Sequence, residues 1–146
     1  MRILLASDHA GFELKHALVQ YLALLGHEPV DMGPHILDPA DDYPDFILPL
    51  ARRVAEEKGC FGVIMGGSGE GEAMAANRVR GVRAAVYYGG SLDIVKLARE
   101  HNDANILSLG GRFLSSGDAE AALRMFLDTA FTSDERHVRR IAKLDQ

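Results

Sequence analysis

The part of the sequence best suited to chemistry is a glycine-rich stretch from Gly66 to Gly71 that is followed at once by Glu72. Four glycines within six positions let the backbone curl, so that several N–H groups can point at one place and cradle an anion. Glu72 adds a carboxylate beside that cradle. When a general base removes a proton from carbon, negative charge develops on a neighbouring oxygen of the substrate. A carboxylate base beside an anion cradle suits such a reaction, because the cradle stabilises that oxygen. The stretch therefore predicts proton-transfer chemistry, whereas Glu72 taken alone would more often be only a first-turn partner of a helix dipole.

Strands and helices must position this stretch, and the sequence alternates between the two along its whole length. Short apolar runs predict five strands, at residues 3–6, 28–31, 62–65, 83–87 and 106–109. Spacing or composition predicts helices at residues 14–25, 73–78, 91–100 and 118–129, with two more that begin at Pro44 and at Ser133. Repeated strand–helix units predict an α/β fold, in which one domain over residues 1–146 has a parallel sheet covered on both faces.

Two of these helices carry signals at their starts. Pro44 suits the first turn of a helix, whereas Pro49, five residues later, predicts a kink or a later start. Ser133 is the expected N-cap of the last helix, because Asp134 and Glu135 follow it in the first turn.

Polar residues gather near the ends of the predicted strands. Ligands of an open parallel sheet bind beyond the carboxyl ends of its strands. Five polar elements are candidates for such a site: Ser7-Asp8-His9 after the first strand, Tyr43 before the second helix, the glycine-rich stretch, His101-Asn102 at the end of the fourth helix, and Gly110-Gly111-Arg112 after the fifth strand. We expect all five to converge on one edge of the sheet.

Composition excludes several classes of protein. With 146 residues, 47% of them hydrophobic, the chain can bury the core of one domain. A net charge of −5 argues against a nucleic-acid-binding surface. The lone cysteine, Cys60, cannot form an intrachain disulfide and precedes a strand, so we expect a small buried side chain in a reducing compartment. No run approaches the roughly 18 apolar residues of a membrane span or resembles a signal peptide. A cytoplasmic location is therefore expected.

Two common ligand motifs are missing. The glycine-rich stretch lacks the G-x-G-x-x-G spacing of a dinucleotide site and the Lys-Ser/Thr pair of a P-loop, which disfavours nucleotide binding. No histidines and carboxylates have an H-E-x-x-H-like spacing, so a metal site is not expected. His101 on its own would be as often structural as chemical.

The last predicted helix is basic as well as amphipathic. Arg136 and Arg140 share one face at i and i+4. A solvated basic face is one interpretation; a pair of guanidinium groups that grips a phosphate is the other. Val138, Ile141 and Leu144 give the same helix an apolar side. The helix could therefore dock on another subunit and carry its arginines into that subunit's site.

Taken together, these motifs resemble the ribose-5-phosphate isomerase B family, which also includes galactose-6-phosphate and allose-6-phosphate isomerases. The resemblance covers nearly the whole chain, and the motifs that carry it are Ser7-Asp8-His9-Ala10-Gly11-Phe12, Asp42-Tyr43-Pro44, the stretch from Gly66 to Glu72 with Ala75-Ala76-Asn77, Arg83, residues 98–105 and Arg136-His137-x-x-Arg140. It implies a Rossmann-like, three-layer αβα sandwich whose C-terminal helix reaches a partner subunit. It also implies a homodimer, or a tetramer, with shared sites, and isomerisation through a cis-enediol without a metal or cofactor.

The resemblance also implies roles for single residues. Many members have a cysteine base at the start of the glycine-rich stretch, where this chain has Gly66; others use a glutamate that corresponds to Glu72. The chain therefore resembles the glutamate-base branch, with His101 as the ring-opening residue and Asp8 and Tyr43 nearby. The substrate-binding residues implied are Asp8, His9, Gly67, Ser68, Gly69, Glu70, Gly71, Asn102, Arg112, Arg136, His137 and Arg140, with Arg136 and Arg140 expected from the partner subunit.

Three functions are compatible with the sequence. The first is interconversion of ribose 5-phosphate and ribulose 5-phosphate; the second is the same reaction on a tetrose, allose or galactose phosphate. Compared with the family that the chain resembles, the segment 85–90 is slightly longer, and the resemblance implies that it borders the substrate, which bears on the choice between the first two functions. The third is a non-catalytic phosphosugar- or nucleotide-binding module. It is disfavoured because binding alone needs neither Glu72 nor His101.

Overall fold

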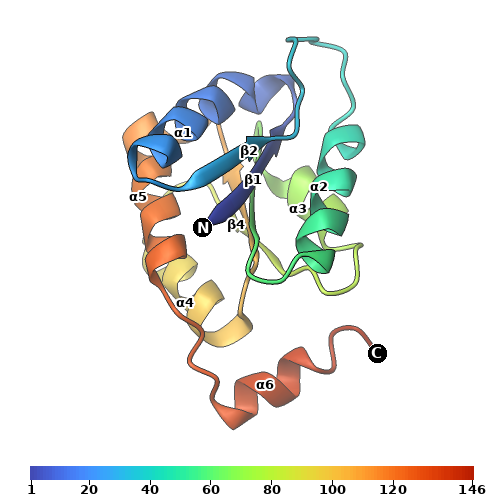
Figure 1. Ribbon diagram of the computed structural model, residues 1–146, viewed down its shortest axis with the longest axis vertical. Coiled ribbons are helices and arrows are strands. Elements are labelled where there is room, and N and C mark those ends of the chain that lie inside the picture. Colours follow the sequence, from blue (N-terminus) through green and yellow to red (C-terminus); the bar gives the residue numbers. More distant parts are fainter.

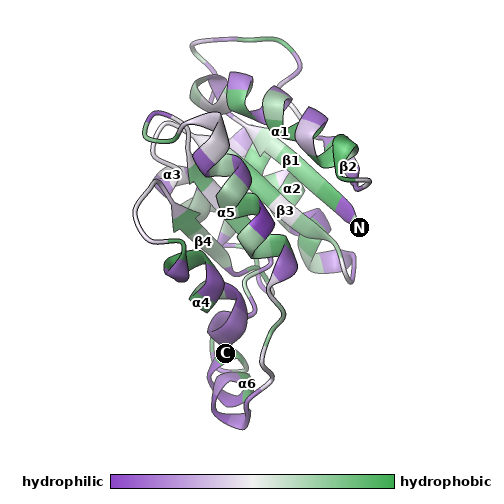
Figure 2. Cartoon of the chain, turned by 90° about the vertical axis from the view of Figure 1, so that its left-hand side faces the viewer, coloured by the Kyte–Doolittle hydropathy of each residue, from purple (hydrophilic) through white to green (hydrophobic).

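In a computed structural model that describes residues 1–146, five parallel strands form one sheet in the order β2-β1-β3-β5-β4. The strands are β1 (Arg2–Ser7), β2 (Glu28–Asp31), β3 (Phe61–Gly66), β4 (Ala84–Tyr87) and β5 (Ile106–Gly110). The three central strands are almost completely buried, because helices cover both faces of the sheet. Figure 2 shows β1 and β3 as apolar strands behind the helices.

All helices except the last form the two outer layers of the predicted αβα sandwich (Figure 1). The helices are α1 (Phe12–Leu24), α2 (Pro44–Glu56), α3 (Glu70–Ala76), α4 (Asp93–Asn102), α5 (Ser116–Asp128) and α6 (Glu135–Ile141), with a short 3-10 turn at His9–Gly11. One core lies between the sheet and α1, α4 and α5, and it includes Leu18, Val95 and Phe126. The other lies between the sheet and α2 and α3, around Ile47 and Leu50. The predicted α/β fold is confirmed, and none of the helices has the length and hydropathy of a membrane span.

The two helix-start predictions had different outcomes. Helix α2 begins at Pro44 as expected, and Pro49 lies inside it without delaying that start. The prediction for Ser133 was wrong: α6 begins at Glu135 after Asp134, and Ser133 has a φ of 58°. An N-cap residue needs an extended backbone, which a residue in the left-handed region does not have.

Helix α6 is the one helix that lies outside the three layers. It lies at the bottom of Figure 1, below α4, at the edge of the sheet where the strands begin. An ordered link holds it there, because Thr132 donates through its backbone N–H and its hydroxyl to the carbonyl of Glu100. The loop of residues 32–43 lies at the opposite end of the molecule, beyond the carboxyl ends of the strands. This separation decides where the predicted site residues lie.

Candidate active site

The glycine-rich stretch forms a loop at the carboxyl edge of the sheet, between β3 and α3. Gly66 pairs with Gly110 at the ends of β3 and β5, so the loops that follow these strands lie side by side. The Glu72 side chain folds back over the end of β3, where it is only 4% exposed. A Cβ built on Gly66 would overlap the Glu72 carboxylate. The carboxylate therefore occupies the space that a side chain at position 66 would need.

Burial makes Glu72 a stronger base than an ordinary glutamate. Removal of the carboxylate from water raises its pKa, and the nearby negative charge of Asp8 adds to this shift. The backbone N–H of Glu72 itself offsets part of it. A carboxylate with a raised pKa binds a proton more strongly once it is ionised, which suits proton abstraction near neutral pH.

The loop beside Glu72 offers hydrogen-bond donors. The backbone N–H groups of Gly67, Ser68 and Gly69 donate to no acceptor within the chain. Gly69 adopts a φ of 78°, a left-handed conformation that glycine allows, and the buried Ser108 hydroxyl donates to its carbonyl at 2.6 Å. Free donors on an anchored loop next to a buried carboxylate can stabilise a negative oxygen that forms during proton transfer.

Polar side chains from other segments surround the loop, as predicted for this edge. Asp8 is buried after β1, where its carboxylate accepts from the backbone N–H groups of Ala10 and Gly11. The guanidinium group of Arg112 lies over Gly67, 3.2 Å from the position of a Cβ there. The Tyr43 ring lies over Gly71 in a similar way, and a Cβ built on that glycine would be 3.0 Å from the ring. The carboxyl edge therefore holds a buried base, free N–H donors and an arginine.

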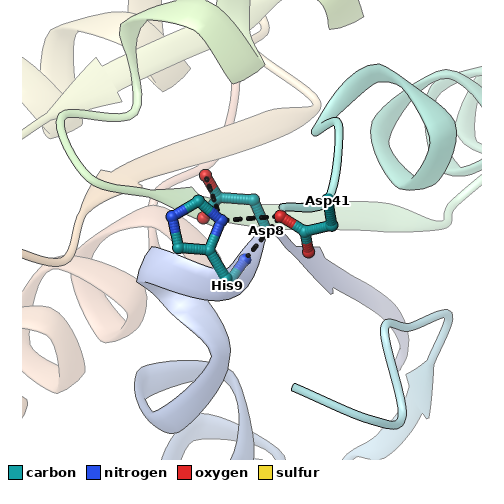
Figure 3. Close-up of side chains that lie close together, drawn as sticks. All are labelled: Asp8, His9 and Asp41. Carbon is teal, nitrogen blue, oxygen red and sulfur yellow. Dashed lines mark hydrogen bonds and ion pairs between the residues drawn. The ribbon is translucent and has the colours of Figure 1, made fainter. Parts of the chain in front are cut away.

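His9 belongs to the same edge and has two carboxylates beside it (Figure 3). Its Nδ1 is 2.6 Å from Oδ1 of Asp41 and 4.0 Å from Oδ2 of Asp8. Ligand atoms of these three residues lie within 4.8 Å of one another, but the contact between Nδ1 and Asp41 makes this a hydrogen-bonded group rather than a cation site. The short distance to Asp41 is that of a charge-assisted hydrogen bond, so Nδ1 is committed to that bond.

The other predicted residues lie at the opposite edge, which corrects the expectation that all five polar elements converge. His101 and Asn102 end α4 immediately before β5, and the carbonyl of Asn102 accepts from Arg83 at the start of β4. β5 is five residues long, so roughly 15 Å of strand separates them from Arg112 at the carboxyl edge. In a parallel sheet, the helix between two strands returns the chain to the edge where strands begin. Residues at the end of α4 therefore lie at the amino edge and not at the carboxyl edge where they were expected.

The C-terminal helix joins His101 at that amino edge. The rings of His101 and His137 stack with centroids 4.3 Å apart. His137 is only 4% exposed, and desolvation followed by the charges of His101 and Arg136 lowers its pKa. Arg136 and Arg140 are exposed on the same helix. The amino edge thus carries two histidines and two arginines, of which only His137 is buried.

A network of ion pairs fixes the end of α4. Asp103, with a φ of 45°, accepts from Arg83 at 3.0 Å and from Arg99 at 2.9 Å. Arg99 is buried against the rings of Phe61 and Phe126 and also donates to the carbonyl of Thr129. The turn that presents His101 and Asn102 is therefore anchored to the start of β4 and to the end of α5.

Two residues with direct roles at the carboxyl edge were not among the predicted ones. Ser108 was a detectable polar residue in the apolar run of β5, and it holds the glycine loop. Asp41 gave no such signal, because it lies in an acidic loop next to Asp42. Only the path of residues 32–43 brings it to His9.

Comparisons with known proteins give matches over nearly the whole chain. A family model described as Ribose/Galactose Isomerase matches residues 3–144. Ribose-5-phosphate isomerase B of Mycobacterium tuberculosis is 43% identical over 141 residues, which cover 97% of this chain and 86% of the relative. The crystal structure of ribose-5-phosphate isomerase B of Mycoplasma genitalium with bound ribulose 5-phosphate has a TM-score of 0.92 and 38% identity, with 98% of this chain and 93% of that chain covered.

The enzyme of the same name from Thermotoga maritima is 41% identical, with a TM-score of 0.92 over 99% of this chain and 97% of that one. The match extends through the sheet and through α6, so it includes both edges described above. The chain therefore belongs to the ribose/galactose isomerase family.

Proposed function

We propose that residues 1–146 form one isomerase domain that interconverts ribose 5-phosphate and ribulose 5-phosphate. The observation that carries this proposal is the Glu72 carboxylate, buried against Gly66 and raised in pKa beside a loop with free N–H groups. The names of the relatives and the ribulose 5-phosphate bound to one of them support the choice of a pentose phosphate.

The proposed reaction moves one proton between two carbons of the open-chain sugar. Glu72 removes the proton from C2 of the aldose, and the electron pair of that bond forms the enediolate while the C1 oxygen becomes negative. The N–H groups of Gly67, Ser68 and Gly69 stabilise that oxygen. Glu72 then returns the proton to C1, and transfer of the hydroxyl proton from O2 to O1 completes the ketose.

A substrate panel tests this function. We expect kcat/KM for ribose 5-phosphate to exceed that for a tetrose 4-phosphate and for allose and galactose 6-phosphates by at least tenfold, since a pocket built for one sugar length loses contacts with another. A preference for a hexose phosphate would reassign the substrate and leave the chemistry intact. Absence of activity on the whole panel, with and without added divalent cation, would contradict the proposed function.

The position of the second group of residues leads to a proposal about assembly. We propose a homodimer in which His101, Asn102, Arg136, His137 and Arg140 of one subunit complete the carboxyl-edge site of the other. These residues are too far from Glu72 to act with it in one chain, and the two arginines are exposed on a helix outside the three layers. In this arrangement His101 transfers the protons that open the ring, and the arginines bind the phosphate.

Mixing inactive variants tests the shared site. Glu72→Gln and Arg140→Ala chains should restore activity when mixed, because each heterodimer then has one intact site and one site with both lesions. Random assortment predicts about a quarter of wild-type activity. Glu72→Gln mixed with Asp8→Asn is the matched control, because both lesions lie at the same edge and no intact site can form. Equal results for the two mixtures, with subunit exchange verified, would place Arg140 in its own subunit's site or in solvent.

A further inference from the structure

Asp41 is a buried carboxylate at the carboxyl edge to which the proposed proton transfer assigns no task. Its Oδ1 accepts twice from the same residue, from Nδ1 of His9 at 2.6 Å and from the His9 backbone N–H at 3.2 Å. The Asp41 side chain is 7% exposed, and its Oδ2 has no hydrogen-bond partner. Burial of a carboxylate with an unpaired oxygen costs folding free energy.

The bond to Asp41 determines what the other ring nitrogen of His9 can do. An ionised carboxylate only accepts, so Nδ1 must carry a proton in this pair. Nε2 is then an acceptor in the neutral ring and a donor in the imidazolium. Figure 3 shows this second nitrogen on the side of the ring that faces away from Asp41. Whether His9 attracts or repels an anion there depends on its charge.

Three charged groups face His9, each from a different segment. Asp41 comes from the loop before α2, Asp8 from the end of β1, and Arg112 from the loop after β5. The hydrogen bond to Asp41 is the largest influence and raises the pKa of His9, with a smaller contribution from Asp8. Desolvation and Arg112 act in the opposite direction. The imidazolium is therefore favoured mainly through Asp41.

We propose that Asp41 is a positioning residue that fixes the His9 ring and holds it as an imidazolium, so that Nε2–H donates to the anionic group of a bound phosphosugar. The pairing itself stands on the geometry of His9 and Asp41; the identity of the ligand rests on the proposed function. Asp41 also fixes the loop two residues before Tyr43, which lies over Gly71. One carboxylate thus sets the charge of His9 and the course of the loop beside it.

The first test is an NMR titration of His9 in the wild-type protein and two variants. Asp41→Asn keeps the size of the side chain and removes its charge, so the His9 midpoint should fall. Asp38→Asn removes the same charge from an exposed position of the same loop and should leave the midpoint unchanged. In the wild-type protein the midpoint should lie above the ordinary histidine value of about 6.5. A wild-type midpoint at or below that value would overturn the proposal without any variant.

The second test is the pH dependence of substrate binding. Between the two His9 midpoints only the wild-type ring is charged, so KM for ribose 5-phosphate should be about tenfold higher in Asp41→Asn there, as expected for loss of a charge-assisted hydrogen bond. Below both midpoints both rings are charged, and the ratio of the two KM values should return toward one. Ionisation of the substrate phosphate changes both KM values by the same factor, so it does not affect their ratio. In Asp41→Asn, kcat should change much less than KM.

The outcomes separate this proposal from the proposed function. Sulfate, whose charge is constant over this range, can replace the substrate as a competing anion if no substrate of the panel reacts. A shifted His9 midpoint together with pH-dependent sulfate affinity would support the role of Asp41 even then. An unchanged midpoint in Asp41→Asn, or a midpoint that shifts while neither KM nor sulfate affinity follows it, would overturn that role.

Discussion

At the carboxyl edge of the sheet the two carboxylates beside the glycine loop are buried, whereas at the amino edge most of the candidate residues face solvent. Glu72 and Asp8 are 4% and 8% exposed, and loops packed on the strand ends hold them. Asn102, Arg136 and Arg140 are exposed, although the ion pairs of Asp103 fix the turn from which Asn102 projects. The carboxyl edge has the surroundings that shift pKa values, and the amino edge has the charges that bind an anion.

This difference teaches that neither edge is a complete site. A base without a phosphate clamp would hold a phosphosugar weakly, and a pair of arginines without a base would only bind it. His137 is the exception at the amino edge, since it is buried against His101 and its Nε2, 3.8 Å from Asp134, has no hydrogen-bond partner. Contact with a second subunit would give that nitrogen and the exposed arginines their partners. The predictions below test each edge separately.

The largest effect is expected from Glu72→Gln. The amide keeps the shape of the side chain and cannot accept the proton, so kcat should fall by about 10²–10⁴-fold. In the wild-type enzyme the acid limb of the kcat/KM profile should lie above the ordinary glutamate pKa of about 4.3, because burial raises the pKa of Glu72 and protonation below that pKa inactivates it.

The control for this variant is its stability. A buried acid with a raised pKa destabilises the folded protein at pH values above its unfolded pKa, so Glu72→Gln should be at least as stable as the wild type at pH 7. Near-normal turnover in this variant would remove Glu72 as the base. Cys60→Ser, in the core at the far end of β3, should retain activity.

A second large effect is expected from Gly66→Ala. The added methyl group overlaps the Glu72 carboxylate, so the base must move away from its position. A displacement of about 1 Å can reduce turnover by about 10²-fold. Gly117→Ala is the matched control, since a Cβ there meets only the Ser115 hydroxyl, at 3.9 Å. If Gly66→Ala is folded and fully active, the tight packing of Gly66 and Glu72 is irrelevant to catalysis.

A smaller loss is expected from His101→Asn, because the sugar ring also opens spontaneously in water. The informative measurement is the kinetic isotope effect with ribose 5-phosphate deuterated at C2. If His101 opens the ring, its loss makes ring opening limiting, and the isotope effect should drop below that of the wild type. Glu72→Asp should raise the isotope effect, because it slows the step that breaks the C–H bond. An increase in both variants would assign His101 to the proton transfer at carbon.

The smallest effect is expected from Arg99→Lys. Lysine keeps the charge but lacks the planar fork, so it leaves the carbonyls of Thr129 and Ala104 without their donor. The free energy of unfolding should fall by about 1–3 kcal/mol, measured by denaturant titration. The acid limb of the kcat/KM profile, which reports the pKa of Glu72, should not move, since Arg99 lies at the amino edge of the sheet. Arg124→Lys on the exposed side of α5 should change stability by less than about 0.5 kcal/mol.

The sequence by itself determined the fold class and the chemistry of the carboxyl edge. Alternation of apolar runs and helical spacing depends on contacts close in sequence, so the five strands were predicted nearly in place. The glycine loop, Asp8 and Arg112 follow directly after strands, and residues so placed must lie at the carboxyl edge of a parallel sheet. For these residues, their place in the sequence directly after a strand was enough to predict their position in the fold.

Only the tertiary structure decided where the remaining residues lie. His101 follows a helix that runs back to the amino edge, so its position depends on the direction of α4 rather than on its nearness to β5. Asp41 meets His9 across 32 positions of sequence, through a loop without regular structure. The close packing of Glu72 on Gly66 depends on a side chain that folds back over its own loop. Nothing in the two sequence segments of such a contact indicates that they meet, so only the packing of the folded chain determines the contact.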